Sequence, residues 1–561
     1  MIEQVVHYYY KQSLKLIQRG DDMKVLIIGG VAAGTKVAAK LKRENRDHEV
    51  TILSESKDIS YAGCGLPYYV GELIHDKEDL IVNTPEAFSE LTGAKVFTEV
   101  RVVKVSPEEN KVEAINLKTN EASTYEYDKL VIASGAQPIK PPLDGVDLDG
   151  VFFIRTPDDA IALRSSLEAD NIKRVTIVGG GFIGLEVAEN LAIKGIKVTV
   201  IDMAEMVPPG FEPEFTEYIA DHLAEHGIMI FTGTKLEAIL GEGKVEKIKT
   251  DKRAIKADAV VLSIGIRANT AFLADSDIEL MPNRTIKVNE YFQTNFENIY
   301  ALGDCASVTN SLTKKPAWSP MGSTANIAGR ITAKNINGES ISYGGVLGTG
   351  VAQLPGLNIG RTGLTEAAAK DAGYDAESVV TVVDDKAHYF PGASVFIVKM
   401  LADKNTKKLL GLQVLGQGAV DKMIDIAVTA ITMGATLEDI EHMDLAYAPP
   451  FSTAIHPFAH TINVLLNKMS GNFKTITPLD YAAGKAEGYK IIDASIVPSL
   501  PKYPYLDLNK VDQQPPTFDK DEKLLLVCSK GKRAYMLQNR LKHLGYNNTL
   551  VLEGGSILTK I

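Results

Sequence analysis

A buried strand, a glycine-rich turn and a helix follow one another twice in this chain of 561 residues. In the first copy the apolar run 24–29 leads into the glycine loop 29–34, and in the second the run 174–179 leads into the loop 179–184. Each helix is followed by a second apolar strand, and each module ends in an apolar strand that meets a glycine. Two such β-α-β modules predict two parallel sheets, each able to bind a dinucleotide at the carboxyl ends of its strands.

Apolar runs and the glycines that stop them give the expected element boundaries. A short strand over 298–304 comes after the second module, so we expect the second module to be inserted into the first. The expected helices are 35–44, 182 to about 194, and 325–337, and the expected strands are 50–53, 130–135, 197–201 and 260–265.

The second glycine loop has the spacing Gly179-x-Gly181-x-x-Gly184 and opens a helix. The first glycine allows the tight turn, the second lets a diphosphate approach the backbone, and the third lets helix and strand pack. Asp202 ends the next strand, where a carboxylate accepts hydrogen bonds from ribose hydroxyls and repels a 2′-phosphate. The module therefore predicts an NADH site and disfavours NADPH; an ordinary tight turn is the alternative. The candidate residues are Gly179, Gly181, Phe182, Ile183, Gly184, Asp202 and Gly265.

The first glycine loop, residues 29–34, departs from this pattern because Val31 stands where the middle glycine is expected. The acidic residue is also displaced, to Glu55, one position beyond the strand end. Asp304 adds support, since it can accept a hydrogen bond from a ribitol hydroxyl of FAD, although an aspartate there also suits a helix N-cap. We interpret this module as an FAD site. Its candidate residues are Gly29, Gly30, Gly34, Glu55, Ala133, Ser134, Gly135 and Asp304.

Cys64 lies in the loop 60–69, directly after the second strand of the first module. Ligands lie at this edge of such a sheet, so we expect the thiol beside the flavin ring. The chain has no CxxC motif, and a lone thiol there can form a mixed disulfide with a substrate thiol or cycle through sulfenic acid. A buried structural cysteine is the alternative, but Gly63, Gly65 and Pro67 describe an irregular loop and favour the redox role. Cys305 is expected to be inert packing.

Composition narrows the class of protein. The net charge of −11 argues against bulk nucleic-acid binding, and no run of about 20 predominantly apolar residues predicts a membrane span. Three cysteines are not a disulfide framework, so we expect a reducing, cytoplasmic location. Residues 1–22 lack the apolar core of a signal peptide; they are either an added helix or lie upstream of a true start at Met23. No metal site is predicted.

These motifs together carry a resemblance. The two modules, Ser60-Tyr-x-x-Cys64 with Leu66-Pro67-Tyr68, Gly303-Asp304 and a mixed third domain resemble the pyridine nucleotide–disulfide oxidoreductases. Within them the chain is similar to the single-cysteine branch of coenzyme A disulfide reductases and NADH-dependent persulfide reductases, with NADH oxidases as close relatives. The resemblance covers roughly residues 24–472. It implies FAD and NADH as cofactors, coenzyme A as substrate or bound ligand, and a homodimer with shared active sites.

The resemblance also implies roles for single residues. Cys64 matches the redox nucleophile, and Tyr447 and Tyr389 match tyrosines that reach the flavin and the substrate sulfur from the partner subunit. From the residues alone, these tyrosines could equally be core aromatics.

A basic helix face offers a site for coenzyme A. Lys36, Lys40 and Arg43 share this face at i, i+4 and i+7, which suits the phosphates of coenzyme A, and they match family contact positions, as does Ser60. The first two differ from the family in residue type, and Gly63 replaces its frequent Asn. A solvated basic face is the alternative.

The C-terminal tail resembles a rhodanese around Cys528. The expected strand 524–527 ends at the loop 528–534, which opens the expected helix 535–544. Backbone N–H groups and a positive dipole end lower the pKa of a cysteine in such a turn and can cradle a persulfide. The usual His-x-Pro-Gly-Ala stretch is missing and the domain is short, so a vestigial domain retained for packing is the alternative.

We therefore expect an α/β protein with two Rossmann-like domains, an α+β dimerisation domain and a small α/β rhodanese-like domain. Its predicted function is NADH-consuming reduction of coenzyme A disulfide, coenzyme A persulfide or polysulfide through Cys64 and FAD. An NADH oxidase that uses O₂ with a cysteine sulfenate and a sulfur-carrier flavoprotein scaffold are the alternatives. The expected domains are an N-terminal extension (1–22), the FAD-binding domain (23–145 and 270–340), the NAD-binding domain (146–269), the dimerisation domain (341–472), a linker (473–488) and an incomplete rhodanese-like domain (489–561).

Overall fold

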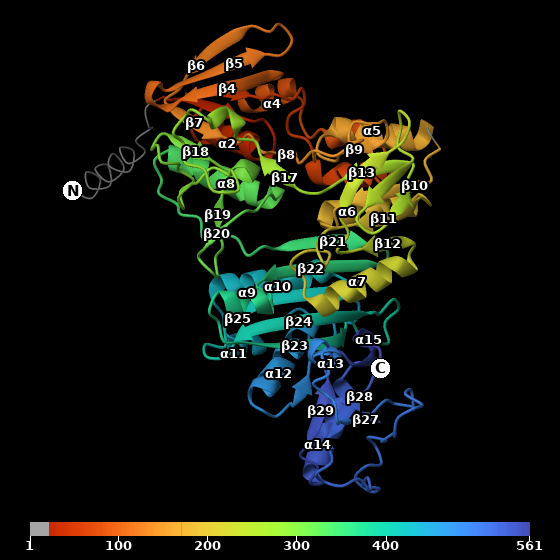
Figure 1. Ribbon diagram of the computed structural model, residues 1–561. Coiled ribbons are helices and arrows are strands. Elements are labelled where there is room, and N and C mark those ends of the chain that lie inside the picture. Colours follow the sequence, from red (N-terminus) through yellow and green to blue (C-terminus); the bar gives the residue numbers. More distant parts are fainter. Residues whose placement is uncertain (1–21, 170) are drawn as a thin grey trace, which may run out of the picture. The chain divides into compact units, whose positions relative to one another are not determined.

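The structure is a computed structural model that describes residues 22–169 and 171–561 (Figure 1). The expectations for the leader concern mainly residues 1–21, which lie outside the described residues. Among the helices of the described residues, none combines the length and the apolar character needed to cross a membrane. The chain divides into a first unit, with residues up to 141, 152–171 and 264–346, and a second unit, with residues 142–151, 172–263 and 347–561.

The first unit is built on a five-stranded parallel sheet in the order β18-β7-β1-β2-β3. The strand β18 comes from the chain after the second module, which confirms that the second module is inserted into the first. The strands are β1 (Lys24–Ile28), β2 (Glu49–Leu53), β3 (Lys95–Phe97), β7 (Lys129–Ile132) and β18 (Ile299–Ala301).

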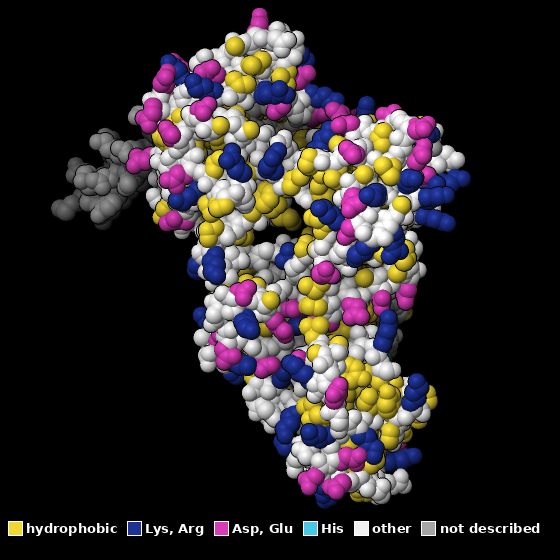
Figure 2. Space-filling model, viewed as in Figure 1, with side chains coloured by type: hydrophobic (Ala, Val, Ile, Leu, Met, Phe, Trp, Pro, Cys, Tyr) yellow, Lys and Arg dark blue, Asp and Glu magenta, His cyan; other side chains and the backbone are white. Residues whose placement is uncertain are grey.

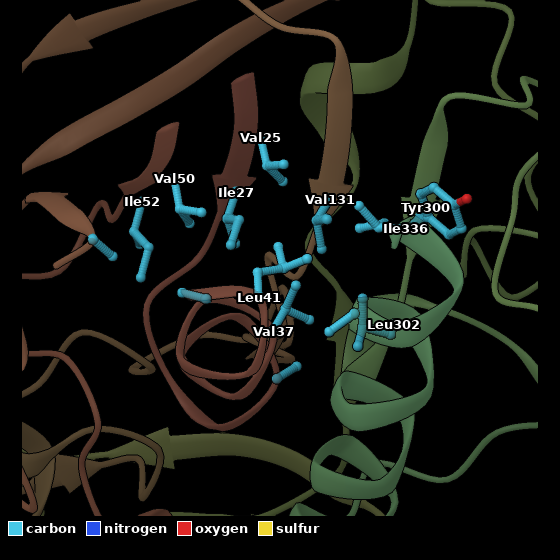
Figure 3. Close-up of a cluster of buried hydrophobic side chains, with 14 of the residues drawn as sticks. Val25, Ile27, Val37, Leu41, Val50, Ile52, Val131, Tyr300, Leu302 and Ile336 are labelled. Carbon is cyan, nitrogen blue, oxygen red and sulfur yellow. The ribbon is translucent and has the colours of Figure 1, made fainter. Parts of the chain in front are cut away.

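Both faces of this sheet are buried. Val25 and Ile27 of β1 point into a core formed with the helices α2 and α8 (Figure 3). Leu26 and Ile28 point to the opposite face, into a core shared with an antiparallel sheet. Alternating residues of β1 thus meet different cores, which is why its sequence is an unbroken apolar run. The covering elements are α2 (Ala32–Glu44), α8 (Gly322–Ile336), β4 (Val100–Ser106), β5 (Lys111–Asn116) and β6 (Ala122–Glu126).

The remaining elements of the first unit include short 3₁₀ helices, which carry the label η. These remaining elements are η1 (Gly63–Gly65), α3 (Leu66–Val70), η2 (Lys77–Leu80), α4 (Pro85–Thr92), η3 (Pro107–Glu109), β8 (Ala136–Pro138), α5 (Pro157–Ala169), β17 (Ile266–Ala268), η4 (Ala271–Leu273), η5 (Gly303–Cys305), β19 (Val308–Thr309) and β20 (Pro316–Ala317).

The second unit contains the second dinucleotide module, with a five-stranded sheet in the order β12-β11-β10-β16-β9. A small antiparallel sheet, β13-β14-β15, lies between β12 and β16 in sequence. The elements are β9 (Val151–Phe152), β10 (Arg174–Val178), α6 (Phe182–Ile193), β11 (Lys197–Ile201), α7 (Pro213–Glu225), β12 (Ile228–Phe231), β13 (Leu236–Leu240), β14 (Lys247–Thr250), β15 (Ala254–Lys256) and β16 (Ala259–Leu262).

The third domain is an antiparallel sheet in the order β21-β22-β25-β24-β23, accompanied by helices (Figure 1). The apolar runs 379–383 and 395–400 predict two strands here, and in the structure β23 extends the first at both ends and β24 extends the second at its C-terminal end. The elements are β21 (Gly350–Leu354), β22 (Leu357–Gly363), α9 (Glu366–Asp371), β23 (Ala376–Asp384), β24 (Val395–Asp403), β25 (Leu409–Gly416), α10 (Val420–Met433), α11 (Leu437–Glu441) and α12 (Pro457–Met469).

The tail is a small parallel sheet in the order β26-β29-β28-β27 with the helix α14. The predicted linker over 473–488 is wrong as a description of this segment, because β26 lies within it and pairs with β29 as an edge strand. The elements are β26 (Thr475–Ile476), α13 (Pro478–Ala482), β27 (Lys490–Asp493), β28 (Leu524–Val527), α14 (Lys532–His543), β29 (Thr549–Leu552) and α15 (Gly555–Leu558).

Three helices begin three residues earlier than predicted. α2 begins at Ala32 instead of Thr35, α8 at Gly322 instead of Ala325, and α14 at Lys532 instead of Tyr535. In α2 and α14 the glycine-containing turn leads straight into the first helical residue, so the first-turn N–H groups lie next to the loop. On the face drawn in Figure 2, basic and acidic side chains are intermixed over the described surface.

Candidate active site

The first glycine loop is a tight turn held between strands. Gly29 has φ +109°, and a Cβ there would lie 2.1 Å from the carbonyl oxygen of Ala133. A Cβ on Gly34 would lie 1.9 Å from the carbonyl oxygen of Gly29, so α2 packs directly against the turn. Gly30 is likewise closed in by Ile59. Glycine is therefore required at these positions by the conformation and by close approach.

The beginning of α2 suits an anion. Its N-cap residue, Val31, supplies no side-chain hydrogen bond, and the first turn holds no acidic residue. The first N–H groups of a helix need partners, and the dipole makes this end positive. A diphosphate fits these requirements.

Asp304 lies in η5, at the carboxyl end of β18, and Arg155 reaches it. The guanidinium Nη2 of Arg155 is 2.7 Å from the carboxylate Oδ2 of Asp304, and Nε donates to the carbonyl oxygen of Ala136 at 3.0 Å. Ser134 donates from its hydroxyl to the carbonyl oxygen of Asn269. Gly135, with φ +69°, accepts from the N–H of Asn269. Sequence reasoning missed Arg155, because no motif surrounds it.

Glu55 lies on the surface at the end of β2. Its carboxylate pairs with the guanidinium of Arg101 at 2.8 Å, and about half of the side chain is exposed. The carboxylate thus has a protein partner at the position where a ribose was expected.

Cys64 lies in η1 and is exposed. The loop before it is tied to the glycine loop, because the N–H of Ser60 donates to the carbonyl oxygen of Gly30 at 2.8 Å. Ser60 adopts φ 49°, an unusual conformation for a residue with a side chain. Tyr61 is half-buried, and this burial raises the pKa of its hydroxyl. The positive charge of Arg155 acts in the opposite direction and lowers that pKa. These contacts bring the Cys64 loop to the same strand ends as Asp304.

The segment after Cys64 is fixed by Arg164 of α5. Its guanidinium lies over the ring of Tyr69, 4.5 Å from the centroid, and donates to the carbonyl oxygens of Tyr69, Ile74 and His75.

The three cysteines all lie in the described part of the chain, and no two of them are joined by a disulfide. Cys305 is buried, and burial raises the pKa of its thiol.

The basic face of α2 is less uniform than the sequence predicts. Lys40 forms an ion pair with Glu44. The first carbons of the Lys36 side chain pack closely against Gly329 of α8, which has no side chain in their way. Arg43 is exposed. Of the three predicted contacts, Arg43 thus presents the most open charge to solvent.

The second glycine loop repeats the first. Gly179 has φ +110°, and a Cβ on Gly184 would lie 2.1 Å from its carbonyl oxygen. Gly181 is the N-cap residue of α6 and has open space around its absent Cβ. The first turn of α6 holds no acidic residue. This helix start therefore also fits a diphosphate.

Asp202 lies at the end of β11 and supports the turn. Its Oδ2 accepts from the N–H of Gly180 at 2.7 Å, and its Oδ1 accepts from the N–H of Ala204 at 2.8 Å. Ile183 is exposed, and the Phe182 ring meets Phe211 edge-on at 6.4 Å. Of the predicted nicotinamide residues, Gly265 alone belongs to the first unit, where its carbonyl oxygen accepts from the N–H of Ile139.

The two predicted tyrosines lie together in the second unit. Tyr447 and Tyr389 are both exposed, and a hydrogen bond between their side chains raises the pKa of Tyr447. Exposed, paired hydroxyls argue against the core-aromatic reading of these residues.

Cys528 lies between β28 and α14 and is buried, with 3% of its surface exposed. Its carbonyl oxygen lies 2.0 Å from where a Cβ on Gly555 would be, so the start of α15 covers the loop. Gly531, with φ +81°, is the N-cap residue of α14. The ammonium group of Lys530 pairs with the carboxylate of Asp384 in β23 at 2.6 Å. The predicted turn geometry is present, but the thiol is less accessible than expected for a reactive cysteine.

Comparison with known proteins places these features in a family. Residues 23–325 match the pyridine nucleotide-disulphide oxidoreductase model, residues 355–459 its dimerisation domain, and residues 477–556 a rhodanese-like domain.

Individual relatives agree with these matches. An NADH oxidase of Methanocaldococcus jannaschii is 34% identical over 80% of this chain and 100% of its own. An NAD(P)H coenzyme A polysulfide/persulfide reductase of Pyrococcus horikoshii is 35% identical over 80% of this chain and 99% of its own. The crystal structure of reduced Bacillus anthracis CoADR-RHD covers 96% of this chain and 98% of its own, with a TM-score of 0.92 at 30% identity. The chain therefore belongs to the pyridine nucleotide-disulphide oxidoreductases, as an NAD(P)H-dependent flavoprotein with a C-terminal rhodanese-like domain.

Proposed function

We propose that this chain is an FAD-dependent, NADH-consuming reductase of coenzyme A disulfide and of coenzyme A persulfide or polysulfide. The observation that carries the proposal is the exposed Cys64 in a loop that Ser60 ties to the first glycine loop. When bound, FAD supplies two-electron transfer from NADH to sulfur. A thiol held at the flavin edge with no second cysteine beside it must take its disulfide partner from the substrate.

The chemistry of Cys64 follows from thiol–disulfide exchange. Its thiolate attacks coenzyme A disulfide, forms a mixed disulfide and expels one coenzyme A thiolate; with a persulfide it expels hydrosulfide instead. Two electrons and one proton then cleave the mixed disulfide, release the second coenzyme A thiol and regenerate the Cys64 thiolate. The sum is one NADH and one proton consumed per disulfide bond reduced.

We further propose that Tyr447 and Tyr389 act in the active site of a partner subunit, where they orient the leaving sulfur or give it a proton. Their exposure and their mutual hydrogen bond support this role. The match to the dimerisation domain, which covers both residues, supports it as well. Arg43, with Lys36, Lys40 and Ser60, is proposed to bind the phosphates of coenzyme A.

The assignment of domains is also a proposal. The FAD-binding domain comprises 23–145 and 270–340, the NAD-binding domain 146–269 and the dimerisation domain 341–472, and we now begin the rhodanese-like domain at β26. We propose a cytoplasmic homodimer.

Two further activities remain candidates on specific observations. The relative named NADH oxidase favours O₂ reduction, with Cys64 as a sulfenate. The turn at Cys528, with Gly531 at the start of α14, favours a sulfur relay between Cys528 and Cys64.

The test is steady-state NADH consumption by the purified yellow protein with coenzyme A disulfide, coenzyme A persulfide, polysulfide and O₂. We expect the coenzyme A substrates to give the highest kcat/KM, with one thiol pair released per NADH. A rate with O₂ alone that equals the rate with every sulfur compound would replace the proposal by the oxidase activity. A flavin that NADH does not bleach would contradict both.

A further inference from the structure

Cys64 belongs to a short stretch of helical chain. The 3₁₀ helix η1, which contains it, has three residues, and α3, which begins directly after η1 at Leu66, has five. Helices this short are not stable by themselves, so the position of the thiol depends on partners elsewhere in the fold. The chain around Cys64 therefore needs an anchor on each side.

The side before Cys64 is tied by backbone hydrogen bonds. The N–H of Ser60 donates to the carbonyl oxygen of Gly30 at 2.8 Å. The N–H of Ala62 donates to the carbonyl oxygen of Leu80 at 2.7 Å. These bonds fix the chain up to two residues before the thiol.

The side after Cys64 is held by Arg164, which α5 supplies from much later in the chain. Three carbonyl oxygens converge on its Nη1, at 3.3 Å from Tyr69, 3.4 Å from Ile74 and 3.0 Å from His75. The guanidinium carbon also lies 4.5 Å from the centroid of the buried Tyr69 ring. Carbonyl oxygens at the end of a helix need a donor, and one guanidinium supplies it for α3 and for the segment 71–75.

Ile74 links this anchor to the thiol. A Cβ on Gly65, the neighbour of Cys64, would lie 3.2 Å from Cδ1 of Ile74 and 3.4 Å from Cδ2 of Leu80. The two apolar side chains thus pack closely against Gly65. Because Arg164 holds the backbone of Ile74, it also holds the side chain that packs on the residue next to the thiol.

We propose that Arg164 is a positioning residue for Cys64, which keeps the thiol where it exchanges with the substrate and receives electrons from the flavin. The inference rests on the proposed role of Cys64. Because the contacts of Arg164 lie on the chain around Cys64, its loss should slow electron transfer from the flavin to sulfur. Reduction of the flavin by NADH should be unaffected.

Stopped-flow kinetics of Arg164→Met separate these two half-reactions. Methionine keeps an apolar chain over the Tyr69 ring but has no donor. Reduction of the flavin by NADH should keep its wild-type rate. Reoxidation of the reduced flavin by coenzyme A disulfide should slow roughly 10- to 100-fold, because a displacement of the reacting group by about 1 Å has effects of this size. Arg164→Lys keeps a cation over the ring and part of the donor set, so it should lie between the wild type and Arg164→Met.

Asp158→Asn is the matched control, since Asp158 lies on the same helix and forms an exposed ion pair with Lys57 at 2.8 Å. It should leave both half-reactions unchanged. Equal slowing of both half-reactions in Arg164→Met, or loss of its flavin, would indicate general destabilisation and overturn the assignment. An unchanged rate of reoxidation would overturn it as well. If Arg164→Met does not fold, Arg164→Lys must show the selective loss by itself.

Hydrogen exchange tests the anchor without any sulfur substrate. Amides of residues 66–75 should exchange at least about 10-fold faster in Arg164→Met than in the wild type, whereas those of β1 in the same unit should keep their rates. Unchanged exchange over 66–75 would overturn the inference whatever the activity. If the wild type reduces no sulfur compound and exchange over 66–75 is nevertheless faster in the variant, the proposed function fails and the anchor stands.

Discussion

Arg155 and Asp304 are 149 residues apart in the chain, and the fold of the first unit brings Nη2 of one to 2.7 Å from Oδ2 of the other. The same guanidinium donates to the carbonyl oxygen of Ala136. It therefore joins the start of β8 to η5, which follows β18, and fixes the direction of the Asp304 carboxylate. The remaining lone pairs of that carboxylate are available to a hydroxyl of a bound ligand.

Asp304→Ala should weaken FAD binding. Loss of a hydrogen bond to a charged acceptor costs about 1.5–3 kcal/mol, which corresponds to an affinity lower by roughly 10- to 100-fold. The variant also leaves Arg155 without its carboxylate. The measurement is the flavin-to-protein absorbance ratio after gel filtration, followed by titration of the stripped protein with FAD.

Asp258→Ala is the control for that experiment. It removes a second arginine–aspartate pair of the same 2.7 Å length, with Arg174, outside the proposed flavin site. Its flavin content should equal that of the wild type. Equal flavin retention in both variants would show that Asp304 does not contact FAD.

Cys64→Ser should abolish disulfide reduction and keep the reduction of the flavin by NADH. A serine hydroxyl cannot form the mixed disulfide, so the rate with coenzyme A disulfide should fall at least about 1000-fold. Stopped-flow bleaching of the flavin by NADH should keep its rate. Cys305→Ala, which removes a buried thiol, is the control and should retain activity. Substantial disulfide reduction by Cys64→Ser would refute the proposed nucleophile.

Strong local patterns account for what the sequence predicted well. Both glycine loops, the strands before them and the helices after them follow from apolar runs that stop at glycine. The exposure of Cys64 also agrees with the irregular, glycine-rich loop that the sequence predicts there.

Features that depend on distant partners could not be predicted. The edge strand β26 has two residues and exists because it pairs with Val551 and Leu552 of β29, so its segment reads as a linker. Arg155 lies in a stretch with no motif, and only the fold takes it to Asp304. Burial of Cys528 depends on α15, which follows it in the chain and closes over its loop.

Cys528→Ser should separate the two sulfur routes. If Cys528 relays sulfur to Cys64, the variant should reduce polysulfide severalfold more slowly and coenzyme A disulfide at the wild-type rate, because only the former delivers sulfane sulfur to a persulfide-forming thiol. NADH consumption with each substrate is the measurement. If Cys528→Ser and the wild type have the same rate with each substrate, the rhodanese-like domain serves only in packing.

Asp202→Ala should reduce the preference for NADH over NADPH by roughly 10-fold, because a carboxylate repels a 2′-phosphate and alanine does not. Since Asp202 also accepts from the N–H groups of Gly180 and Ala204, affinity for NADH should fall as well. The ratio of kcat/KM for the two cofactors is the measurement. Glu205→Ala, a carboxylate of the same loop, is the control, and a ratio that stays unchanged in Asp202→Ala would remove the electrostatic explanation.

His456 should make the stability of the protein fall as the pH is lowered. It is the N-cap residue of α12, where its Nδ1 accepts from the N–H of Phe458 at 3.2 Å. Burial, helped by the charge of Lys422, lowers its pKa to about 4 from an ordinary 6.5. Between these two values the unfolded chain binds a proton that the folded chain does not, so stability is lost as pH falls through this window.

The variant His456→Asn isolates this effect, because asparagine caps a helix without titrating. The melting temperature should fall less between about pH 7 and about pH 5 in His456→Asn than in the wild type. His442→Asn changes an exposed histidine and should keep the wild-type dependence. Because all other titrating groups are common to the three proteins, their contributions cancel in the comparison. Equal slopes in His456→Asn and the wild type would mean that His456 takes up its proton in the folded state as readily as in the unfolded state.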